Sequence, residues 1–223
     1  MGGVPVGGRV ATVATPLRCA VLISGSGSGM QALVKAQQEQ NLRHTTAVVI
    51  SNRPEAGGIK LAKKLGIDVE IIVPSPDEGM NLRTSHEDAI MEVLDRYNIE
   101  FVVLSGYMRL LSPHILTSWG GRIVNIHPSY LPHFPGAHAH KDVLAAGVKL
   151  TGCTVHMVDE GMDTGPILAQ ATVPVLRGDD EQSLSERVKV EEHRLYPQVL
   201  TWLSKGYITV EQGQVHLEIP EAV

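Results

Sequence analysis

The chain has 223 residues, of which 43% are hydrophobic and 19% are charged, a composition typical of globular rather than disordered proteins. Its formal net charge of −5 argues against a large nucleic-acid surface, which requires clustered Lys and Arg. Two cysteines, Cys19 and Cys153, are too few for a disulfide framework or a cysteine-rich zinc site. We therefore expect small-molecule partners and no nucleic acid.

The first sixteen residues differ in composition from the rest of the chain. They are rich in Gly, Val and Thr, include Arg9, and lack the basic segment followed by an apolar core that marks a signal peptide. No apolar run approaches the ~20 residues that span a bilayer, so no membrane partner is expected. We expect residues 1–16 to form a flexible leader, residues 17–223 to form a single domain, and the protein to be cytoplasmic.

Short apolar runs alternate with amphipathic stretches from residue 18 onward. The runs predict buried strands, and the stretches, rich in helix-forming residues, predict helices. Strands are expected at 18–23, 47–50, 69–73, 101–104, 123–126 and 154–158, and helices at 30–38, 57–65, 82–97 and 181–203. This alternation predicts an α/β fold with a mainly parallel sheet and helices on both faces. Because such sheets bind ligands beyond the carboxyl ends of their strands, the loops after Ile23 and Ile126 are candidate sites.

The loop of residues 24–29, Ser-Gly-Ser-Gly-Ser-Gly, joins the first strand directly to the first helix. Its glycines allow close approach of the backbone to an anion, and the helix N-terminus offers unpaired N–H groups, so a phosphate loop is predicted, with Ser28 as a cap or phosphate ligand. A turn that binds nothing is the alternative. The loop also matches a loose dinucleotide fingerprint, with Arg53 placed to meet an NADP 2′-phosphate. Residues 51–54 contain no acidic residue for an NAD ribose, so a monophosphate suits the loop at least as well.

Asn125 and His127 stand at the end of the fifth predicted strand, before a Pro-rich loop over residues 128–136. Alternate residues of a strand share one face, so both side chains are expected to point into one pocket. An amide can donate a hydrogen bond to an oxyanion, and an imidazole can transfer a proton. This pair therefore favours acyl transfer to an amine, without an enzyme nucleophile. A buried hydrogen-bonded pair is the alternative.

Carboxylates at Asp159, Glu160 and Asp163 follow the later strand and are expected at the same rim. A carboxylate beside His127 would raise the pKa of the imidazole and fix its orientation. The sequence pattern does not choose among the three.

Two further features bear on ligands. The histidines at 127, 133, 138 and 140 suggest a metal alternative, but their irregular spacing and the lack of a supporting ligand cluster lead us to predict no metal.

Glu192 lies about 40° from Val188 at the edge of the apolar stripe of the last helix. A carboxylate there needs a partner, either an internal Lys or Arg or a ligand amine or hydroxyl.

Together these motifs resemble the phosphoribosylglycinamide formyltransferase family, folate-dependent enzymes of purine biosynthesis. The resemblance runs from about Arg18 to Trp202. It is carried by residues 23–28, 104–113 (Leu-Ser-Gly-Tyr-Met-Arg-Leu-Leu-Ser-Pro), 125–129 (Asn-Ile-His-Pro-Ser), 135–138 and 163–167 (Asp-Thr-Gly-Pro-Ile).

The resemblance implies a Rossmann-like formyltransferase fold with an antiparallel C-terminal extension. It also implies transfer of the formyl group of the co-substrate 10-formyltetrahydrofolate to the amine of glycinamide ribonucleotide. The products are formylglycinamide ribonucleotide and tetrahydrofolate, in de novo IMP synthesis.

The resemblance also assigns roles by position. It implies Asn125, His127 and Asp163 as catalytic residues; Gly27, Ser28, Gly29 and Glu192 as ribonucleotide-binding residues; and Arg83, Met108, Arg109, Leu110, Leu111 and Asn125 as folate-binding residues. Two positions depart from the family pattern. Gly29 stands where the family typically has Asn, which leaves backbone donation alone, and His133 replaces the usual Lys.

The sequence leaves several other functions open. A formyltetrahydrofolate hydrolase would share the Asn, His and Asp but give the formyl group to water. Such enzymes usually carry an N-terminal regulatory domain, for which sixteen residues are too few, and the phosphate loop would have no task. Methionyl-tRNA formyltransferase is disfavoured because we find neither a C-terminal RNA-binding domain nor an excess of basic residues. Two further hypotheses are an NADP-dependent oxidoreductase and a non-catalytic nucleotide-binding module. A monomer or a homodimer is expected.

Overall fold

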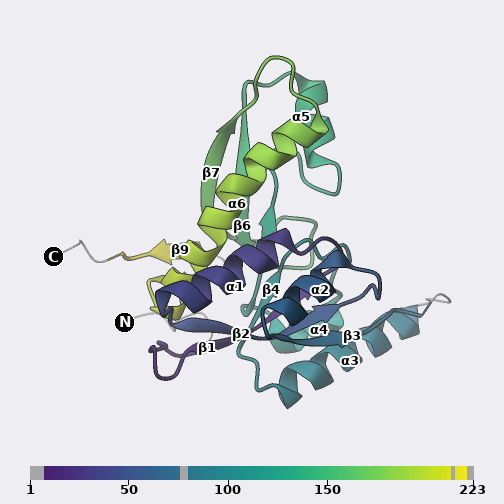
Figure 1. The fold of residues 1–223 in the computed structure, drawn as a ribbon, viewed down its shortest axis with the longest axis vertical. Coiled ribbons are helices and arrows are strands. Elements are labelled where there is room, and N and C mark those ends of the chain that lie inside the picture. The colour runs from purple at the N-terminus through teal and green to yellow at the C-terminus, as the bar shows by residue number, and fades with distance from the viewer. Residues whose placement is uncertain (1–7, 76–79, 212–213, 220–223) are drawn as a thin grey trace.

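A seven-stranded sheet is the centre of the computed structural model, which describes residues 8–75, 80–211 and 214–219 (Figure 1). The strands are β1 (Leu17–Ile23), β2 (His44–Ser51), β3 (Asp68–Ile71), β4 (Phe101–Leu104), β5 (Ile123–His127), β6 (Leu150–Met157) and β7 (Ile167–Pro174). Their order is β3-β2-β1-β4-β5-β6-β7. Strands β1 to β5 pair in parallel, whereas β6 runs antiparallel to β5 and β7 antiparallel to β6. The parallel half and the antiparallel extension are both confirmed.

Helices cover both faces of the sheet. They are α1 (Ser28–Gln40), α2 (Gly57–Lys64), α3 (Met80–Arg96), α4 (Pro113–Trp119), α5 (Ala139–Ala146) and α6 (Glu181–Ser204). One core packs α1, α2, α5 and α6 against side chains such as Val21, and the other packs α3 and α4 against side chains such as Leu22. Because successive residues of β1 enter different cores, the strand is apolar from Cys19 to Ile23, and only Arg18 near its start is charged.

The predicted strands and helices are all present, with ends that shift by a few residues. The sequence pattern does not predict α4, α5, β7 or the small antiparallel hairpin of β8 (Ile208–Glu211) and β9 (Gln214–Leu217). Helix α4 has only seven residues, too few to show a period, and begins at Pro113 behind the N-cap Ser112, whose Oγ accepts a hydrogen bond from the His114 N–H. Strand β7 mixes polar and apolar residues because only part of it is buried.

The N-terminal segment packs against the domain from residue 8 onward. Arg9 forms an ion pair with Glu100 at 2.5 Å, and Ala11 is fully buried and donates its N–H to the Ser204 carbonyl. The expected flexible leader included residues 1–7, which lie outside the described residues. Arg9 and Ala11 thus contact the rest of the chain although they precede the expected boundary at residue 17, whereas Val10 and residues 12–15 are exposed.

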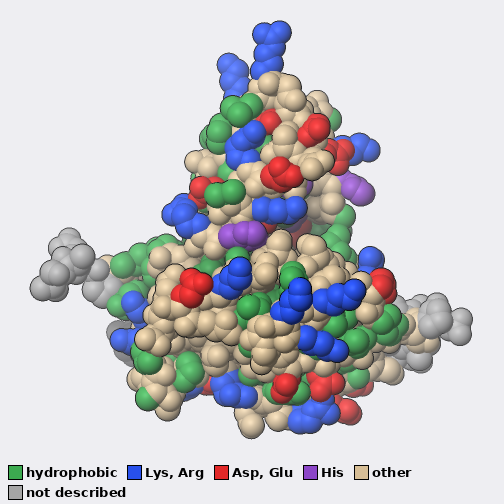
Figure 2. All heavy atoms as spheres, viewed as in Figure 1, with side chains coloured by type: hydrophobic (Ala, Val, Ile, Leu, Met, Phe, Trp, Pro, Cys, Tyr) green, Lys and Arg blue, Asp and Glu red, His purple; other side chains and the backbone are tan. Residues whose placement is uncertain are grey.

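The surface carries charges of both signs. Lys and Arg side chains are interspersed with Asp and Glu over the face shown in Figure 2, consistent with the small net charge. Within the described ranges, no helix combines the length and apolarity needed to cross a membrane.

Candidate active site

A cavity of about 550 Å³ opens at the carboxyl ends of β1, β4 and β5. It lies where chain order reverses in the sheet, between β1 and β4, as expected for an open parallel sheet. The 24–29 loop and residues 104–111 form one side, and the segments around Asn125, His127 and Asp163 form another. Helix α6 closes the cavity with Lys189, Glu192 and Tyr196. The structure therefore brings together the two loops that the sequence indicated.

The glycine-rich loop is shaped by close backbone contact with α2. Gly27 has a left-handed φ of 74°, and a Cβ atom there would lie 2.6 Å from the Gly58 Cα. The Gly58 N–H donates to the Gly25 carbonyl at 3.0 Å. Helix α1 begins behind Gly27 with no side-chain cap, so its first N–H groups are not satisfied by a capping side chain. This geometry is suited to an anion.

His127 ends β5 and is held by the loop that follows it. Its Nε2–H donates to the Phe134 carbonyl at 2.9 Å, and only 6% of its side chain is exposed. Phe134 has a left-handed φ of 57°, and its carbonyl also accepts from the Ser129 hydroxyl at 3.0 Å. Because Nε2 keeps its proton for Phe134, Nδ1 is the nitrogen that gains or loses a proton. Nδ1 lies 3.3 Å from the Asp163 carboxylate.

Burial lowers the pKa of His127 below its ordinary value of 6.5. The Phe134 carbonyl and the Asp163 charge raise this pKa, as the sequence led us to expect, but burial outweighs them. The imidazole is therefore mainly neutral at pH 7, and its Nδ1 lone pair can accept a proton.

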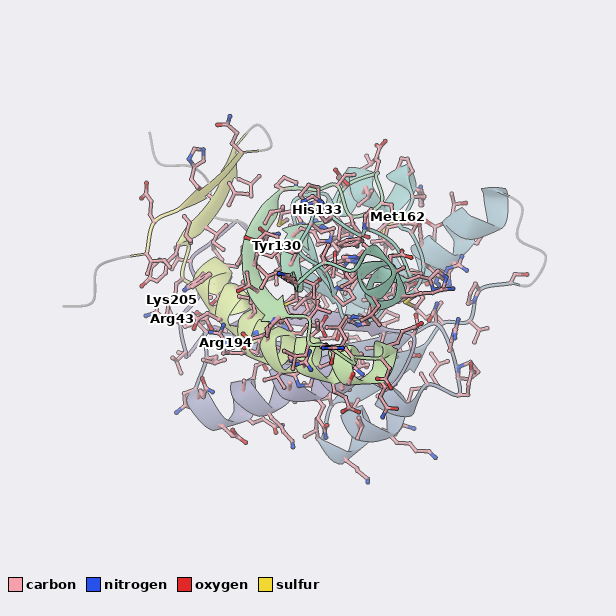
Figure 3. All side chains as sticks on the ribbon, turned by 90° about the horizontal axis from the view of Figure 1, so that it is seen from above. Arg43, Tyr130, His133, Met162, Arg194 and Lys205 are labelled. Atoms are coloured by element: carbon pink, nitrogen blue, oxygen red, sulfur yellow. The ribbon has the colours of Figure 1, made fainter. Side chains whose placement is uncertain are left out.

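Asp163 occupies a strained turn beside His127. Its φ is 56°, and its Oδ2 accepts the Gly136 N–H at 2.8 Å. Burial acts to raise the pKa of Asp163, but His156, whose Nε2 lies 3.6 Å from the carboxylate, the hydrogen bond from the Gly136 N–H and the positive charge that His127 can carry lower it overall. In the view from above in Figure 3, Tyr130 and His133 mark the loop that contains Gly136, and Met162 marks the loop that contains Asp163.

The structure distinguishes among the three carboxylates that the sequence left open. Asp159 accepts hydrogen bonds from the Gly161 N–H and the Thr164 hydroxyl, so it stabilises its own turn. Glu160 is exposed. Asp163 is the one placed against His127.

His156 also lines the cavity, although the sequence pattern does not mark it as a site residue. The antiparallel register of β5 and β6 sets it opposite Asn125, and its Nε2 lies 3.2 Å from the Asn125 Nδ2. Its Nδ1–H donates to the Met157 carbonyl at 2.9 Å, so in the neutral ring Nε2 accepts an amide N–H from Asn125. This contact orients the Asn125 amide. Only the pairing of β6 with β5 reveals it, and the strand pattern does not specify that pairing.

Glu192 stands on the α6 side of the cavity. Its carboxylate has no hydrogen-bond or ion-pair partner among the residues that the structure describes, so no internal Lys or Arg neutralises it. Burial raises its pKa from 4.5 to about 7, although the charge of Lys189 acts to lower it. One turn further on, Tyr196 is buried and donates its hydroxyl to the Leu104 and Val124 carbonyls at 2.8 and 3.1 Å. This contact fixes α6 over β4 and β5.

The predicted folate residues line another part of the cavity. Met108 and Leu110 are 58% and 50% exposed, so they offer apolar surface to a ligand, whereas Leu111 is buried in the core. Arg109 lines the same stretch. The side chain of Arg83 lies outside the described residues.

The four histidines considered for a metal do not form one cluster. His127 and His140 line the cavity, and His133 and His138 are exposed. Across the described part of the chain, no group of three or more His, Cys, Asp or Glu has the arrangement of a metal site.

Comparison with known proteins finds close relatives. Residues 17–200 match the model of the family described as Formyl transferase. The chain is 36% identical over 198 residues to phosphoribosylglycinamide formyltransferase of Escherichia coli (strain K12), covering 89% of this chain and 92% of that protein. It is 43% identical over 199 residues to the trifunctional purine biosynthetic protein adenosine-3 of Bos taurus, covering 89% of this chain but 19% of that protein. The chain thus spans about a fifth of that relative. Glycinamide ribonucleotide transformylase 1 from Symbiobacterium toebii has a TM-score of 0.86 at 41% identity, covering 92% of this chain and 95% of that one.

Proposed function

We propose that this chain, which belongs to the phosphoribosylglycinamide formyltransferase family of formyl transferases, passes the formyl group of 10-formyltetrahydrofolate to the amine of glycinamide ribonucleotide. The products are formylglycinamide ribonucleotide and tetrahydrofolate, in purine biosynthesis. One observation carries the proposal: Asn125, His127 and Asp163 converge on the same cavity that the glycine-rich loop lines. The family uses folate-derived formyl donors, and we take 10-formyltetrahydrofolate as the donor here.

The acceptor is proposed to lie between the glycine-rich loop and α6. Its phosphate would bind the backbone of Gly27, Ser28 and Gly29 at the N-terminus of α1. Glu192 would then accept a hydrogen bond from the glycinamide or ribose part of the ligand, which supplies the partner that the protein does not.

The donor is proposed to lie along residues 108–111. The exposed apolar side chains of Met108 and Leu110 suit a flat aromatic ring system, and Arg109 supplies positive charge for folate carboxylates. Arg83 stays a prediction from the family pattern. Asn125 stands where the two ligands would meet.

The reaction then needs one oxyanion donor and one proton carrier. The acceptor amine attacks the formyl carbon, and the carbonyl π electrons move to oxygen. The Asn125 amide, oriented by His156, donates an N–H to that oxyanion. His127 Nδ1 takes the proton that the amine loses, and Asp163 stabilises the imidazolium. As the carbonyl reforms, the bond from carbon to the folate nitrogen breaks, and that nitrogen keeps the electron pair and receives the proton.

We also propose that the enzyme acts in the cytosol on small molecules alone. A monomer or homodimer remains our prediction for its assembly.

Formyl loss with and without the acceptor tests the proposal. Purified protein is incubated with 10-formyltetrahydrofolate, and release of tetrahydrofolate is followed in the presence and absence of glycinamide ribonucleotide. We expect release to depend on the acceptor and to drop sharply in Asp163→Asn but not in Asp142→Asn, a matched change on the exposed side of α5. Equal release in both mixtures would reject the transferase and favour a hydrolase.

A further inference from the structure

Ser105 is a buried hydroxyl at the cavity that the proposed mechanism leaves without a task. It follows β4 directly and is 8% exposed. Its backbone N–H donates to the Leu22 carbonyl at 2.9 Å, which fixes it beside the glycine-rich loop. Its Oγ has no hydrogen-bond partner within the part of the chain that the structure describes, although the residue lines the cavity. A hydroxyl at a cavity wall without a protein partner is available to donate a hydrogen bond to a ligand bound there.

Gly29 and Ser105 compete for the same space. A Cβ atom built on Gly29 would lie 2.7 Å from the Ser105 Oγ, closer than real Cβ contacts allow, but 4.0 Å from the Ser105 Cβ, which is ordinary contact. Unlike Gly27, Gly29 has no left-handed φ that would itself require glycine. The Ser105 hydroxyl is therefore the group that a side chain at position 29 would have to displace. It lies beside the first turn of α1, where such a side chain would begin.

We propose that Ser105 is a phosphate-binding residue, whose Oγ–H donates to the ribonucleotide phosphate from the position that a side chain at residue 29 would otherwise fill. The proposal rests on the proposed function and adds a side-chain donor to the backbone donors of the loop. The hydroxyl comes from the β4 end, so the phosphate is held by two loops rather than one. These loops are joined by the Ser24 N–H, which donates to the Gly106 carbonyl at 3.1 Å.

The test begins with Ser105→Ala. A lost hydrogen bond to a charged group corresponds to about tenfold or more in affinity, so KM for glycinamide ribonucleotide should rise by at least about tenfold. The values of kcat and of KM for the folate should stay near those of the wild type, because the phosphate lies away from the reacting atoms. Ser118→Ala, an exposed serine on α4, is the matched control and should change neither.

A substrate without phosphate separates direct contact from a structural effect. Binding of glycinamide riboside, measured by calorimetry, should be the same in wild type and Ser105→Ala, whereas binding of the ribonucleotide should weaken in the variant. Equal weakening for both ligands would mean that Ser105 only supports the loop, and the proposal would be wrong.

Moving the hydroxyl from one loop to the other is the sharpest experiment. Gly29→Ser alone should bind the ribonucleotide poorly, because its Cβ meets the Ser105 hydroxyl. Combined with Ser105→Ala, the same change should restore most of the affinity, since the clash is gone and a hydroxyl returns to the site. A double variant no better than the worse single variant would overturn the proposal. If the wild type forms no product that depends on the ribonucleotide, the proposed function fails. An active wild type that matches its Ser105→Ala variant rejects only this inference.

Discussion

Replacing Glu192 with Gln should make the protein more stable at alkaline pH. The Glu192 carboxylate lies at the cavity with its pKa raised from 4.5 to about 7, because burial disfavours the charged form. In the unfolded chain the same group titrates near 4.5. The folded protein therefore binds more protons than the unfolded one between these values, and its stability falls as pH rises through this range. Gln keeps the shape and removes the charge.

The magnitude follows from the two pKa values. A difference of about 2.5 between them corresponds to roughly 3 to 4 kcal/mol well above pH 7, at about 1.4 kcal/mol for each pH unit. About 40% of this destabilisation is already present at pH 5.5, so the advantage of Glu192→Gln should grow by about 2 kcal/mol between pH 5.5 and pH 8.5.

Urea unfolding of wild type and Glu192→Gln at both pH values measures this change, with the slope m checked for constancy. Glu191→Gln is the matched control, because it removes a neighbouring carboxylate that pairs with Arg194 near the surface and should change stability by less than about 1 kcal/mol at either pH. The reasoning is refuted if the stability difference for Glu192→Gln does not depend on pH, or if the wild type is the more stable at pH 8.5. The same variant should bind glycinamide ribonucleotide less tightly, so that stability and function change in opposite directions.

Three further predictions concern the catalytic side. His127→Ala should lower kcat by about 10²-fold to 10⁴-fold and leave folate binding largely intact. In the wild type, kcat/KM should rise with pH as His127 loses its proton, at a pKa below 6.5, and the variant should lack this rise. A near-normal rate in the variant would assign proton transfer to another group. His156→Ala should lower kcat by about tenfold without changing KM for either substrate, because Asn125 loses its orientation; steady-state kinetics would contradict this if only KM rose. Tyr196→Phe should lower the free energy of unfolding by about 1 to 3 kcal/mol, measured in urea, because two buried carbonyls lose their donor; an unchanged midpoint would show that they find other partners.

The sequence predicted elements well where burial alone decides them. Strands β1 and β4 are covered on both faces, so all of β4 and the residues of β1 from Cys19 to Ile23 are apolar and easily recognised. Strand alternation also pairs Asn125 and His127 correctly. The short helix α4 and the half-exposed strand β7 leave no comparable pattern.

The rest of the site depends on contacts between distant segments. His156 reaches Asn125 only because β6 runs antiparallel to β5. Asp163, rather than Asp159, meets His127 because a left-handed turn at Asp163 lets it bind the Gly136 N–H. The pattern of charged residues contains neither fact. The proposed catalytic residues were therefore predictable as residue types near one loop, but their geometry was not.

The hydroxyl of Tyr196 also bears on how the two ligands would be spaced. It contacts the last carbonyl of β4 and a carbonyl of β5, and Ser105 and Asn125 are the next residues along these strands. Glu192 lies one turn away on the same helix. Ser105, proposed to bind the acceptor, and Asn125, proposed to act at the formyl carbon, are thus held apart by the spacing of two neighbouring strands, about 4.8 Å. The spacing of the two strands therefore sets the distance between Ser105 and Asn125, independently of the conformation of the loops that follow them.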